Sequence, residues 1–278
     1  MKVLGVSTSP RKEGNTDILV TQVLYGAESE GAETRFIRPA DLELKPCNGC
    51  MACVFKRRDC VIKDRFNEFL DALRWADAVV IGTPTYILSS NSVMKNILDR
   101  LVVFGLTREL AGKSAMAVAT AGVIGWEPFA LEQPMTAILA AGMAPVDRFV
   151  GYGQGPGEIL YDDAAMDRAY DGGVALAKGE KNFIGDKGGC PICRLNMVTY
   201  RGGKGYCPLC DISGEVDSVE GVATIIPDAD SENRWSEASM KYHYEEKILP
   251  SGPWFRENFR EIHSAVKEFF SEKKGVPQ

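Results

Sequence analysis

Hydrophobic and polar positions along the first 178 residues alternate between two periods. Short runs rich in β-branched residues are typical of buried strands, and longer segments with apolar residues three or four apart are typical of helices. The expected strands are Val3–Ser7, Thr34–Ile37, Ala78–Thr83, Ser114–Thr120 and Val146–Gly151. The expected helices are 16–31, 64–76, 92–105, 127–142 and 162–179. Because parallel strands need crossover connections, this alternation predicts a doubly wound α/β domain with a five-stranded parallel sheet.

The pattern changes near Asn182. Residues 182–226 are rich in glycine, contain paired cysteines and show no helical period, so we expect a small separate β module. Amphipathic helical patterns follow at 231–249 and 254–274, and the intervening "PSGP" at 250–253 is expected to break the helix. The predicted parts of the chain are a first domain at 1–181, the β module at 182–226 and a helical extension at 227–278.

Composition and charge narrow the class of protein. At 278 residues the chain can bury a substantial core, and 45% hydrophobic with 25% charged residues is typical of a globular protein. The net charge of −6 argues against nucleic acid as the main partner. Because neither a signal peptide nor a membrane-spanning apolar run is evident, we expect a cytoplasmic protein without a membrane partner. The eight cysteines are then expected to bind metal rather than to form disulfides.

The segment 7–16 connects the first expected strand to the first expected helix, a place where doubly wound sheets commonly receive a phosphate. It offers hydroxyls, an amide and a guanidinium on Ser7, Ser9, Thr16, Asn15 and Arg11. Backbone N–H groups at the start of the helix add to these donors. The dinucleotide glycine fingerprint and the Walker lysine motif are both absent, so this phosphate need not belong to NAD or ATP. The alternative is an ordinary loop with Asn15 or Thr16 as N-cap.

Two later loops are expected at the same edge of the sheet. Residues 83–92 follow the third expected strand and residues 120–127 follow the fourth, and their small residues would let backbone amides approach a flat polar ring. Tyr86 and Trp126 are candidate stacking walls for that ring, with partly buried packing as the alternative. The candidate binding residues in these loops are Pro84, Thr85, Tyr86, Ile87, Thr120, Ala121, Gly122 and Gly125.

Over about residues 1–178, these motifs resemble the flavodoxin-like domain of the NADPH-dependent FMN reductase superfamily. In that family a Ser-x-Arg-x-x-Gly-Asn-Thr loop binds the FMN phosphate, and the matching residues here are Ser9, Arg11, Gly14, Asn15 and Thr16. A Thr-Pro-x-Tyr segment beside the flavin ring corresponds to Thr83–Tyr86, and "LDR" at 98–100 matches the helix that follows. The resemblance implies FMN as the cofactor, with its phosphate in the loop after the first strand.

Four cysteines lie within fourteen residues of the sequence "KPCNGCMACVFKRRDC". They are Cys47, Cys50, Cys53 and Cys60, with two gaps of two residues and one of six. Thiolates so spaced can each take one corner of an iron-sulfur cubane, whereas zinc sites usually use two separated pairs. The alternative is a set of structural or redox-active thiols. The motif is similar to that of the iron-sulfur flavoproteins, a branch of the same superfamily, which implies a 4Fe-4S cluster in the loop 47–60.

A second quartet lies in the β module and consists of Cys190, Cys193, Cys207 and Cys210. Two Cys-x-x-Cys pairs can place four sulfurs tetrahedrally around one ion, and "GGKG" between them indicates a hairpin turn. The module resembles a zinc ribbon. A rubredoxin-like iron site has the same ligand geometry, but rubredoxins favour glycine after each pair, where this chain has Arg194 and Asp211. Structural zinc is therefore favoured over a one-electron iron relay.

Together these features predict an iron-sulfur flavoprotein, an oxidoreductase in which FMN exchanges electrons with a substrate while the cluster passes them singly to or from a partner. We name no catalytic residue, because no side chain need act as acid or base. Lys56, Arg57 and Arg58 form either a solvated loop or a docking surface for an acidic donor such as ferredoxin. The resemblance implies a homodimer or homotetramer.

Two other functions stay open from the sequence. One is an NAD(P)H-dependent FMN or quinone reductase whose metal sites are purely structural. The other is a flavodoxin-like interaction module that uses the zinc ribbon to bind a protein or nucleic acid.

Overall fold

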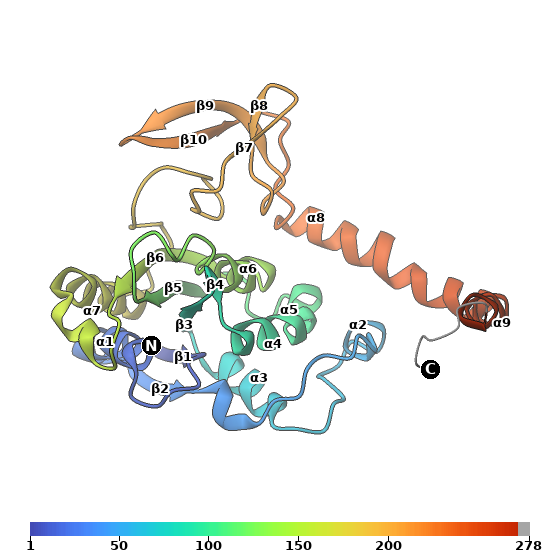
Figure 1. Ribbon diagram of the computed structural model, residues 1–278, viewed down its shortest axis with the longest axis horizontal. Coiled ribbons are helices and arrows are strands. Elements are labelled where there is room, and N and C mark those ends of the chain that lie inside the picture. The colour runs from blue at the N-terminus through green and yellow to red at the C-terminus, as the bar shows by residue number, and fades with distance from the viewer. Residues whose placement is uncertain (272–278) are drawn as a thin grey trace.

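The computed structural model describes residues 1–271 and contains two sheets (Figure 1). The parallel strands of the first are β1 (Lys2–Ser7), β2 (Glu33–Ile37), β3 (Ala78–Tyr86), β5 (Ser114–Ala121) and β6 (Ala144–Tyr152). Their order is β2-β1-β3-β5-β6, and the short β4 (Ser89–Ser90) pairs antiparallel with the end of β3. The predicted parallel α/β sheet is confirmed, and its strand order is the flavodoxin-like one.

Helices cover both faces of this sheet. One face carries α1 (Asn15–Ser29) and α7 (Asp163–Ala177), and the other carries α3 (Phe66–Trp75), α4 (Ser92–Arg100), α5 (Val102–Thr107) and α6 (Glu132–Ala140). Val80 and Val118 enter the core beneath α1 and α7, whereas Val79 and Ala117 enter the opposite core. The central strands β3 and β5 contain continuous apolar runs because both of their faces are buried, whereas the edge strand β2 is mostly exposed. Shorter helical turns are η1 (Pro39–Leu42), α2 (Ala52–Phe55) and η2 (Glu158–Tyr161).

Two expected helices differ in extent from those observed. The single helix expected at 92–105 is divided into α4 and α5 at Leu101, whose N–H bonds Leu98 O three residues back at 3.2 Å in a tighter turn. The helix expected from residue 127 begins at Glu132, which places Pro134 in the first turn, where the missing N–H costs no helical hydrogen bond.

Helices α1 and α7 approach closely at two glycines. A Cβ on Gly173 would lie 1.9 Å from Val23 O, and a Cβ on Gly26 would lie 2.0 Å from Tyr170 O. The neighbouring Gly172 differs, because its Cβ would meet only the flexible end of Met116, at 2.6 Å. Gly173 therefore sets the spacing of the two helices and Gly172 does not.

We expect Gly173→Ala to lower the free energy of unfolding by about 3 kcal/mol, because the added methyl group must push two helix backbones apart. The matched variant Gly172→Ala is expected to lose much less, since Met116 can move and alanine favours the helix. Urea unfolding followed by circular dichroism measures both. Equal losses in the two variants would contradict the proposed close approach.

The second sheet is antiparallel, in the order β10-β9-β8-β7. Its strands are β7 (Thr199–Arg201), β8 (Lys204–Tyr206), β9 (Ser213–Val219) and β10 (Val222–Pro227). The predicted hairpin is confirmed, with Gly202 and Gly203 both at positive φ in the turn between β7 and β8. Figure 1 shows this sheet lying over β6 and α6, and Ile212 and Ile225 share one buried apolar cluster with the α6 side of the first sheet.

One continuous helical run follows the second sheet. It consists of α8 (Glu237–Tyr242), the π-helical segment η3 (His243–Ile248) and α9 (Leu249–Ser271). The break expected at "PSGP" is wrong, because the helix continues through it: Leu249 N bonds Tyr244 O in the π pattern just before Pro250, and Pro253 lies inside α9. The end of the predicted helix and extension, 272–278, lies outside the described residues.

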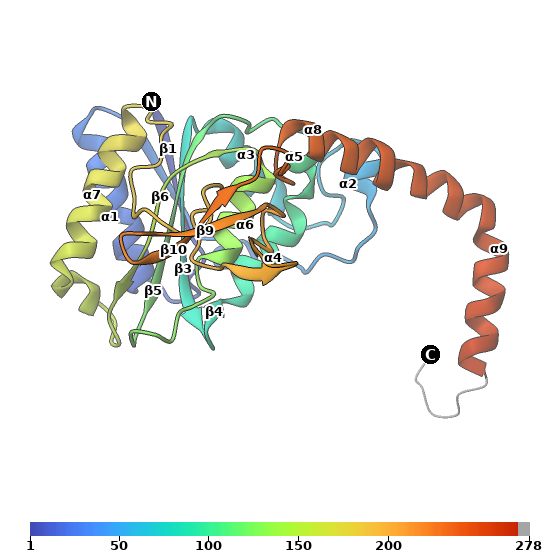
Figure 2. The same cartoon turned by 90° about the horizontal axis from the view of Figure 1, so that it is seen from above.

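Figure 2 shows the helical run extending away from the two sheets and bending along its length. Among residues 1–271, no helix is long and apolar enough to cross a membrane.

Candidate functional site

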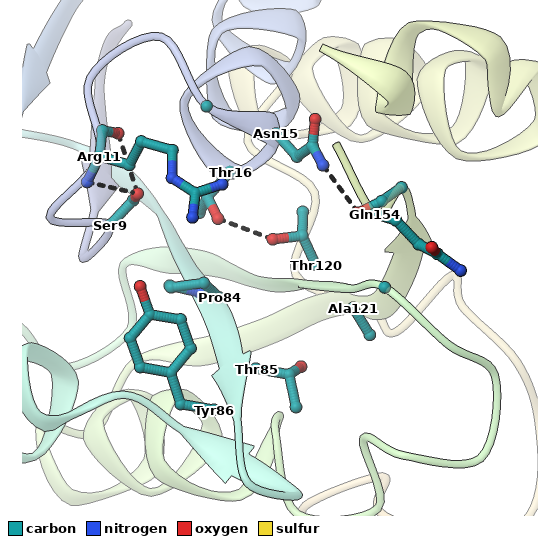
Figure 3. A pocket seen from close by; sticks show the side chains of 13 residues that line it. Ser9, Arg11, Asn15, Thr16, Pro84, Thr85, Tyr86, Thr120, Ala121 and Gln154 are labelled. Atoms are coloured by element: carbon teal, nitrogen blue, oxygen red, sulfur yellow. Dashed lines mark hydrogen bonds between the residues drawn. The ribbon is translucent and has the colours of Figure 1, made fainter. Parts of the chain in front are cut away.

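A polar pocket opens where β1, β3, β5 and β6 end at one edge of the first sheet (Figure 3). Its lining residues are Ser9, Arg11, Gly14, Asn15, Thr16, Pro84, Thr85, Tyr86, Thr120, Ala121, Gly122, Gly153 and Gln154. The three loops singled out from the sequence meet here because parallel strands finish at a common edge. The predicted residues Ser7, Ile87 and Gly125 are not part of the lining.

The loop after β1 forms a tight turn around Ser9. Its Oγ accepts a hydrogen bond from Arg11 N at 3.1 Å and donates to Arg11 O at 2.9 Å. The N-cap of α1 is Gly14, not Asn15 or Thr16 as the alternative reading of the loop would have it, so no side chain of the cap covers the first N–H groups of the helix. Figure 3 shows the Arg11 guanidinium reaching across the pocket toward Thr16.

Asn15 and Thr16 connect the loop to neighbouring strand ends. Asn15 Nδ2 donates to Gly153 O at 2.8 Å and to Gly155 O at 3.0 Å. The Thr16 and Thr120 hydroxyl oxygens lie 2.7 Å apart, and both residues are buried. The Asn15 amide therefore fixes the loop after β6, while the two threonines hold the β1 and β5 loops together at the floor of the pocket.

Ser7 supports the pocket from behind. Its hydroxyl donates to Asp17 Oδ1 at 2.6 Å, and both residues are buried. Asp17 also accepts a hydrogen bond from Glu13 N at 2.8 Å and forms an ion pair with Arg38. Ser7 thus stabilises the loop through Asp17 and does not face the pocket.

Thr85 carries the clearest sign of a missing polar ligand. Thr85 lines the pocket, and its buried Oγ1 has no hydrogen-bond partner within residues 1–271. A buried hydroxyl without a partner costs free energy unless a ligand supplies one. Thr85, Pro84 and Tyr86 form the wall opposite Arg11 in Figure 3, so the residues present fit a molecule with an anionic end and a flat polar end, as FMN has.

Gly153 and Gln154 line the pocket but were not predicted from the sequence. They follow β6, so the position of a loop after the last parallel strand is the signal that would have indicated them. A Cβ on Gly153 would lie 2.9 Å from Asn15 Nδ2, so glycine is needed for the Asn15 hydrogen bond.

Exposed apolar side chains occur at the pocket-lining end of β3 and in the segments that follow β3 and β5. They are Tyr86, Ile87, Val123, Ile124, Trp126 and Phe129. Ile87 is 94% exposed at the turn between β3 and β4, and Trp126 is 66% exposed and outside the lining. Gly125 lies between these residues at positive φ, where it shapes the loop after β5.

The first cysteine quartet lies in the loop 47–60, between η1 and α3. Cys47 and Cys50 are exposed, whereas Cys53 and Cys60 are half-buried. Burial raises the pKa of the Cys53 thiol, and the neighbouring thiols of Cys60 and Cys50 add to the rise. Within residues 1–271 this quartet does not gather as closely as the second one. A cubane carries its ligands on four separate irons, so wider spacing suits a cluster better than a single ion.

Residues of α8 and η3 pack against this loop. Met240 and Tyr244 form a buried apolar cluster with Val54, and Tyr244 Oη donates to Val102 O at 3.2 Å. Burial raises the pKa of Tyr244 to about 12, with the Cys53 thiol adding to the rise. The C-terminal helices therefore cover the inner side of the cysteine loop.

The second quartet converges on one point. The sulfurs of Cys190, Cys193, Cys207 and Cys210 lie within 4.8 Å of one another, and all four residues are fully buried. The Cys193 and Cys207 sulfurs are 3.7 Å apart. A tetrahedron with metal–sulfur bonds of about 2.3 Å has an edge of about 3.8 Å, so the four sulfurs fit one tetrahedral ion.

The two halves of this site have the same turn. Arg194 N donates to Cys190 O and Asp211 N donates to Cys207 O, both at 2.8 Å. Arg194 and Asp211 have φ of +60° and +65°, the left-handed conformation that glycine usually supplies. Arg194 and Asp211 adopt this turn although neither is glycine. The absence of glycine after each cysteine pair therefore distinguishes zinc from rubredoxin-type iron less well than the sequence suggested.

Known proteins similar in sequence match mainly the first domain of the chain. A family model described as NADPH-dependent FMN reductase matches residues 1–156. An iron-sulfur flavoprotein of Methanocaldococcus jannaschii is 34% identical over 187 residues, 64% of this chain and 96% of that protein. One of Archaeoglobus fulgidus is 31% identical over 164 residues, 59% of this chain and 74% of that protein.

Among solved structures, a flavone reductase matches 100% of both chains with a TM-score of 0.78 and 20% sequence identity. This similarity is one of fold, and it extends over the second sheet and the C-terminal helices as well as the first domain.

Proposed function

Because this chain belongs to the NADPH-dependent FMN reductase family and to its iron-sulfur flavoproteins, we propose that it transfers electrons between FMN and a one-electron partner through a 4Fe-4S cluster. The observation that carries the proposal is the presence in one chain of the pocket at the β-sheet edge and a separate cysteine quartet with cluster-type spacing. FMN, when bound, can exchange two electrons with one reactant and single electrons with another.

The chain's own residues divide the binding of FMN between two ends of the pocket. Arg11 and the first N–H groups of α1 would hold the phosphate, since Arg11 makes no ion pair with another residue in the described range 1–271. Thr85 Oγ1 would bond a polar atom of the flavin ring, with Pro84 and Tyr86 beside it. Thr16, Thr120 and Asn15 position these groups through the contacts described above.

We expect Arg11→Ala to raise the dissociation constant for FMN about tenfold or more, because a charged hydrogen bond to the phosphate contributes about 1.5–3 kcal/mol. Riboflavin, which lacks the phosphate, should bind the variant and the parent equally. Flavin fluorescence titration of the apoprotein measures both constants. Lys12→Ala is the matched control, since Lys12 is a neighbouring exposed cation that approaches Asp41 rather than the pocket. Equal weakening of FMN and riboflavin would contradict a phosphate contact.

We assign the two quartets to different metals. Cys47, Cys50, Cys53 and Cys60 would ligate the cluster, at a surface where Lys56–Arg58 are exposed to an acidic partner. The second quartet would hold structural zinc, because its four sulfurs are fully buried and closed to substrate. Soft thiolate ligands suit either metal, so metal analysis decides between zinc and a rubredoxin-type iron.

Anaerobic reduction tests the electron route. Purified protein is mixed with either NADPH or reduced ferredoxin, and flavin absorbance is followed by stopped flow. The proposal predicts that reduced ferredoxin bleaches the flavin rapidly and that Cys53→Ser slows this reaction more than tenfold. Rapid bleaching by NADPH, with no effect of the cysteine substitution on either donor, would contradict the cluster route.

A second candidate function, favoured by that last result, is an NAD(P)H-dependent reductase of a planar aromatic acceptor. The observation in its favour is the group of exposed apolar side chains at the end of β3 and in the segments that follow β3 and β5, which includes Tyr86, Ile87 and Trp126. A solved protein that shares the fold over the whole of both chains is a flavone reductase.

We also propose a homodimer or homotetramer. Phe255, Phe259, Ile262, Val266 and Phe269 recur every three or four residues along α9, the spacing of a helix that packs against another helix. Sedimentation analysis should give two or four times the mass of one chain, and Phe259→Glu should lower it. Arg260→Glu is the control on the adjoining face of α9. A single-chain mass for the parent protein would contradict this assembly.

A further inference from the structure

A buried arginine faces one ligand of the proposed cluster. Arg100 is the last residue of α4, and its side chain is 0% exposed. Its Nη2 lies 3.2 Å from Cys60 Sγ, within hydrogen-bonding distance for sulfur. A guanidinium N–H can only donate, so the sulfur of Cys60 is the acceptor.

Asp64 holds the guanidinium in one position. Its Oδ2 lies 2.5 Å from Arg100 Nη1 and its Oδ1 lies 2.9 Å from Nη2, a bidentate pair in which the Asp64 side chain is 4% exposed. Nη1 also donates to Lys45 O at 3.0 Å, and the guanidinium lies over the Phe66 ring, 4.0 Å from its centroid. With this many fixed partners, the N–H directed at Cys60 has a defined orientation.

Packing alone does not account for a charged side chain here. A buried Arg–Asp pair pays a desolvation cost that an apolar pair of similar volume would avoid. The charged pair fixes the direction of the N–H bond to Cys60, because Arg100 Nη2 contacts both Cys60 Sγ and Asp64 Oδ1. Hydrogen bonds to ligand sulfurs and nearby charges are among the main determinants of the potential of an iron-sulfur cluster.

The same helix also contacts the loop after β1. Asn91, the N-cap of α4, accepts a hydrogen bond from Met94 N and donates from Nδ2 to Thr8 O at 2.7 Å, in the loop after β1. Arg100 lies nine positions after Asn91, a length of about 13 Å along the helix. Helix α4 therefore ties the loop that would hold the FMN phosphate to a ligand of the proposed cluster.

We propose that Arg100 is a positioning residue of the cluster: it orients Cys60 by donating to its sulfur, and it raises the reduction potential by stabilising the more negative, reduced form. The inference rests on the proposed function, since it requires a cluster in the loop 47–60.

The experiment is a redox titration of anaerobically purified holoprotein, followed by electron paramagnetic resonance of the reduced cluster. Arg100→Gln is expected to lower the midpoint potential, because a cation near the sulfur is lost. Asp64→Asn is expected to raise it, because a buried anion is lost while Arg100 keeps its donors. Arg100→Lys should return the potential toward that of the parent. FMN content should be the same in all four proteins.

The opposite signs of the potential shifts expected for Arg100→Gln and Asp64→Asn distinguish this role from a purely structural one. Substitutions that merely loosen the loop would shift the potential in the same direction in Arg100→Gln and Asp64→Asn, and that result would overturn the inference, as would an unchanged potential in both. If Arg100→Gln fails to retain the cluster, Asp64→Asn carries the test: a raised potential is expected, and a lowered or unchanged one would overturn the inference. A parent protein without iron and sulfide would instead overturn the proposed function, and the inference with it.

Discussion

Replacing Cys53 by serine is expected to remove the iron and sulfide from the protein while FMN stays bound. Cys53 lies at the centre of the first quartet, half-buried and close to the thiols of Cys50 and Cys60. A serine hydroxyl is a poor substitute for a thiolate, which is the ligand that iron-sulfur clusters use. The pocket lining includes no residue of the loop 47–60, so flavin binding should not depend on it.

Iron, acid-labile sulfide and flavin per chain, measured on anaerobically purified protein, test this result. We expect iron to fall from about four per chain to fewer than about one, with flavin unchanged. Met51→Leu is the matched control, because Met51 lies in the same loop and has no ligand role. Loss of FMN together with iron would show that the two sites are not independent, and unchanged iron would remove Cys53 from the ligand set.

Replacing Cys190 and Cys207 together by serine is expected to unfold the second sheet. Structural zinc contributes an apparent binding free energy of about 10–16 kcal/mol in small zinc modules. The strands around this site are short, β7 and β8 having three residues each, so they cannot form a stable sheet without the ion. Because Cys190 and Cys207 belong to a core cluster shared with the first sheet, the melting temperature of the whole chain should also fall.

Limited proteolysis and zinc analysis measure the local effect. The double variant should lose its zinc, about one ion per chain, and should be cleaved rapidly between residues 182 and 226. Tyr200→Ala is the control, since Tyr200 is 71% exposed in the same hairpin. A protease-resistant second sheet without metal would contradict a structural role for the ion.

Strands β3 and β5 were predictable because both of their faces are buried and each contains a continuous apolar run, as in 78–81. The edge strand β2 is mostly exposed, and its sequence ETRFI is not such a run. The break at 250–253 was mispredicted because the π-helical segment continues directly into α9 and α9 contains Pro253, which the proline pattern does not reveal.

Local motifs indicated the loops of the pocket but not the contacts within it. Ser7 belongs to the same predicted segment, 7–16, as Ser9, yet its hydroxyl is bonded to Asp17, a contact that depends on how α1 packs. Gly153 and Gln154 carry no motif and reach the pocket only because β6 ends beside β5. The Arg100–Cys60 contact joins residues forty positions apart, so only the folded chain brings it about.

An optical spectrum of anaerobically purified protein, with metal and sulfide analysis of the same sample, tests whether one chain holds both FMN and an iron-sulfur cluster. We expect flavin bands with a broad thiolate-to-iron absorption, and about four irons, four sulfides, one zinc and one FMN per chain. Flavin bands without iron or sulfide would contradict this expectation.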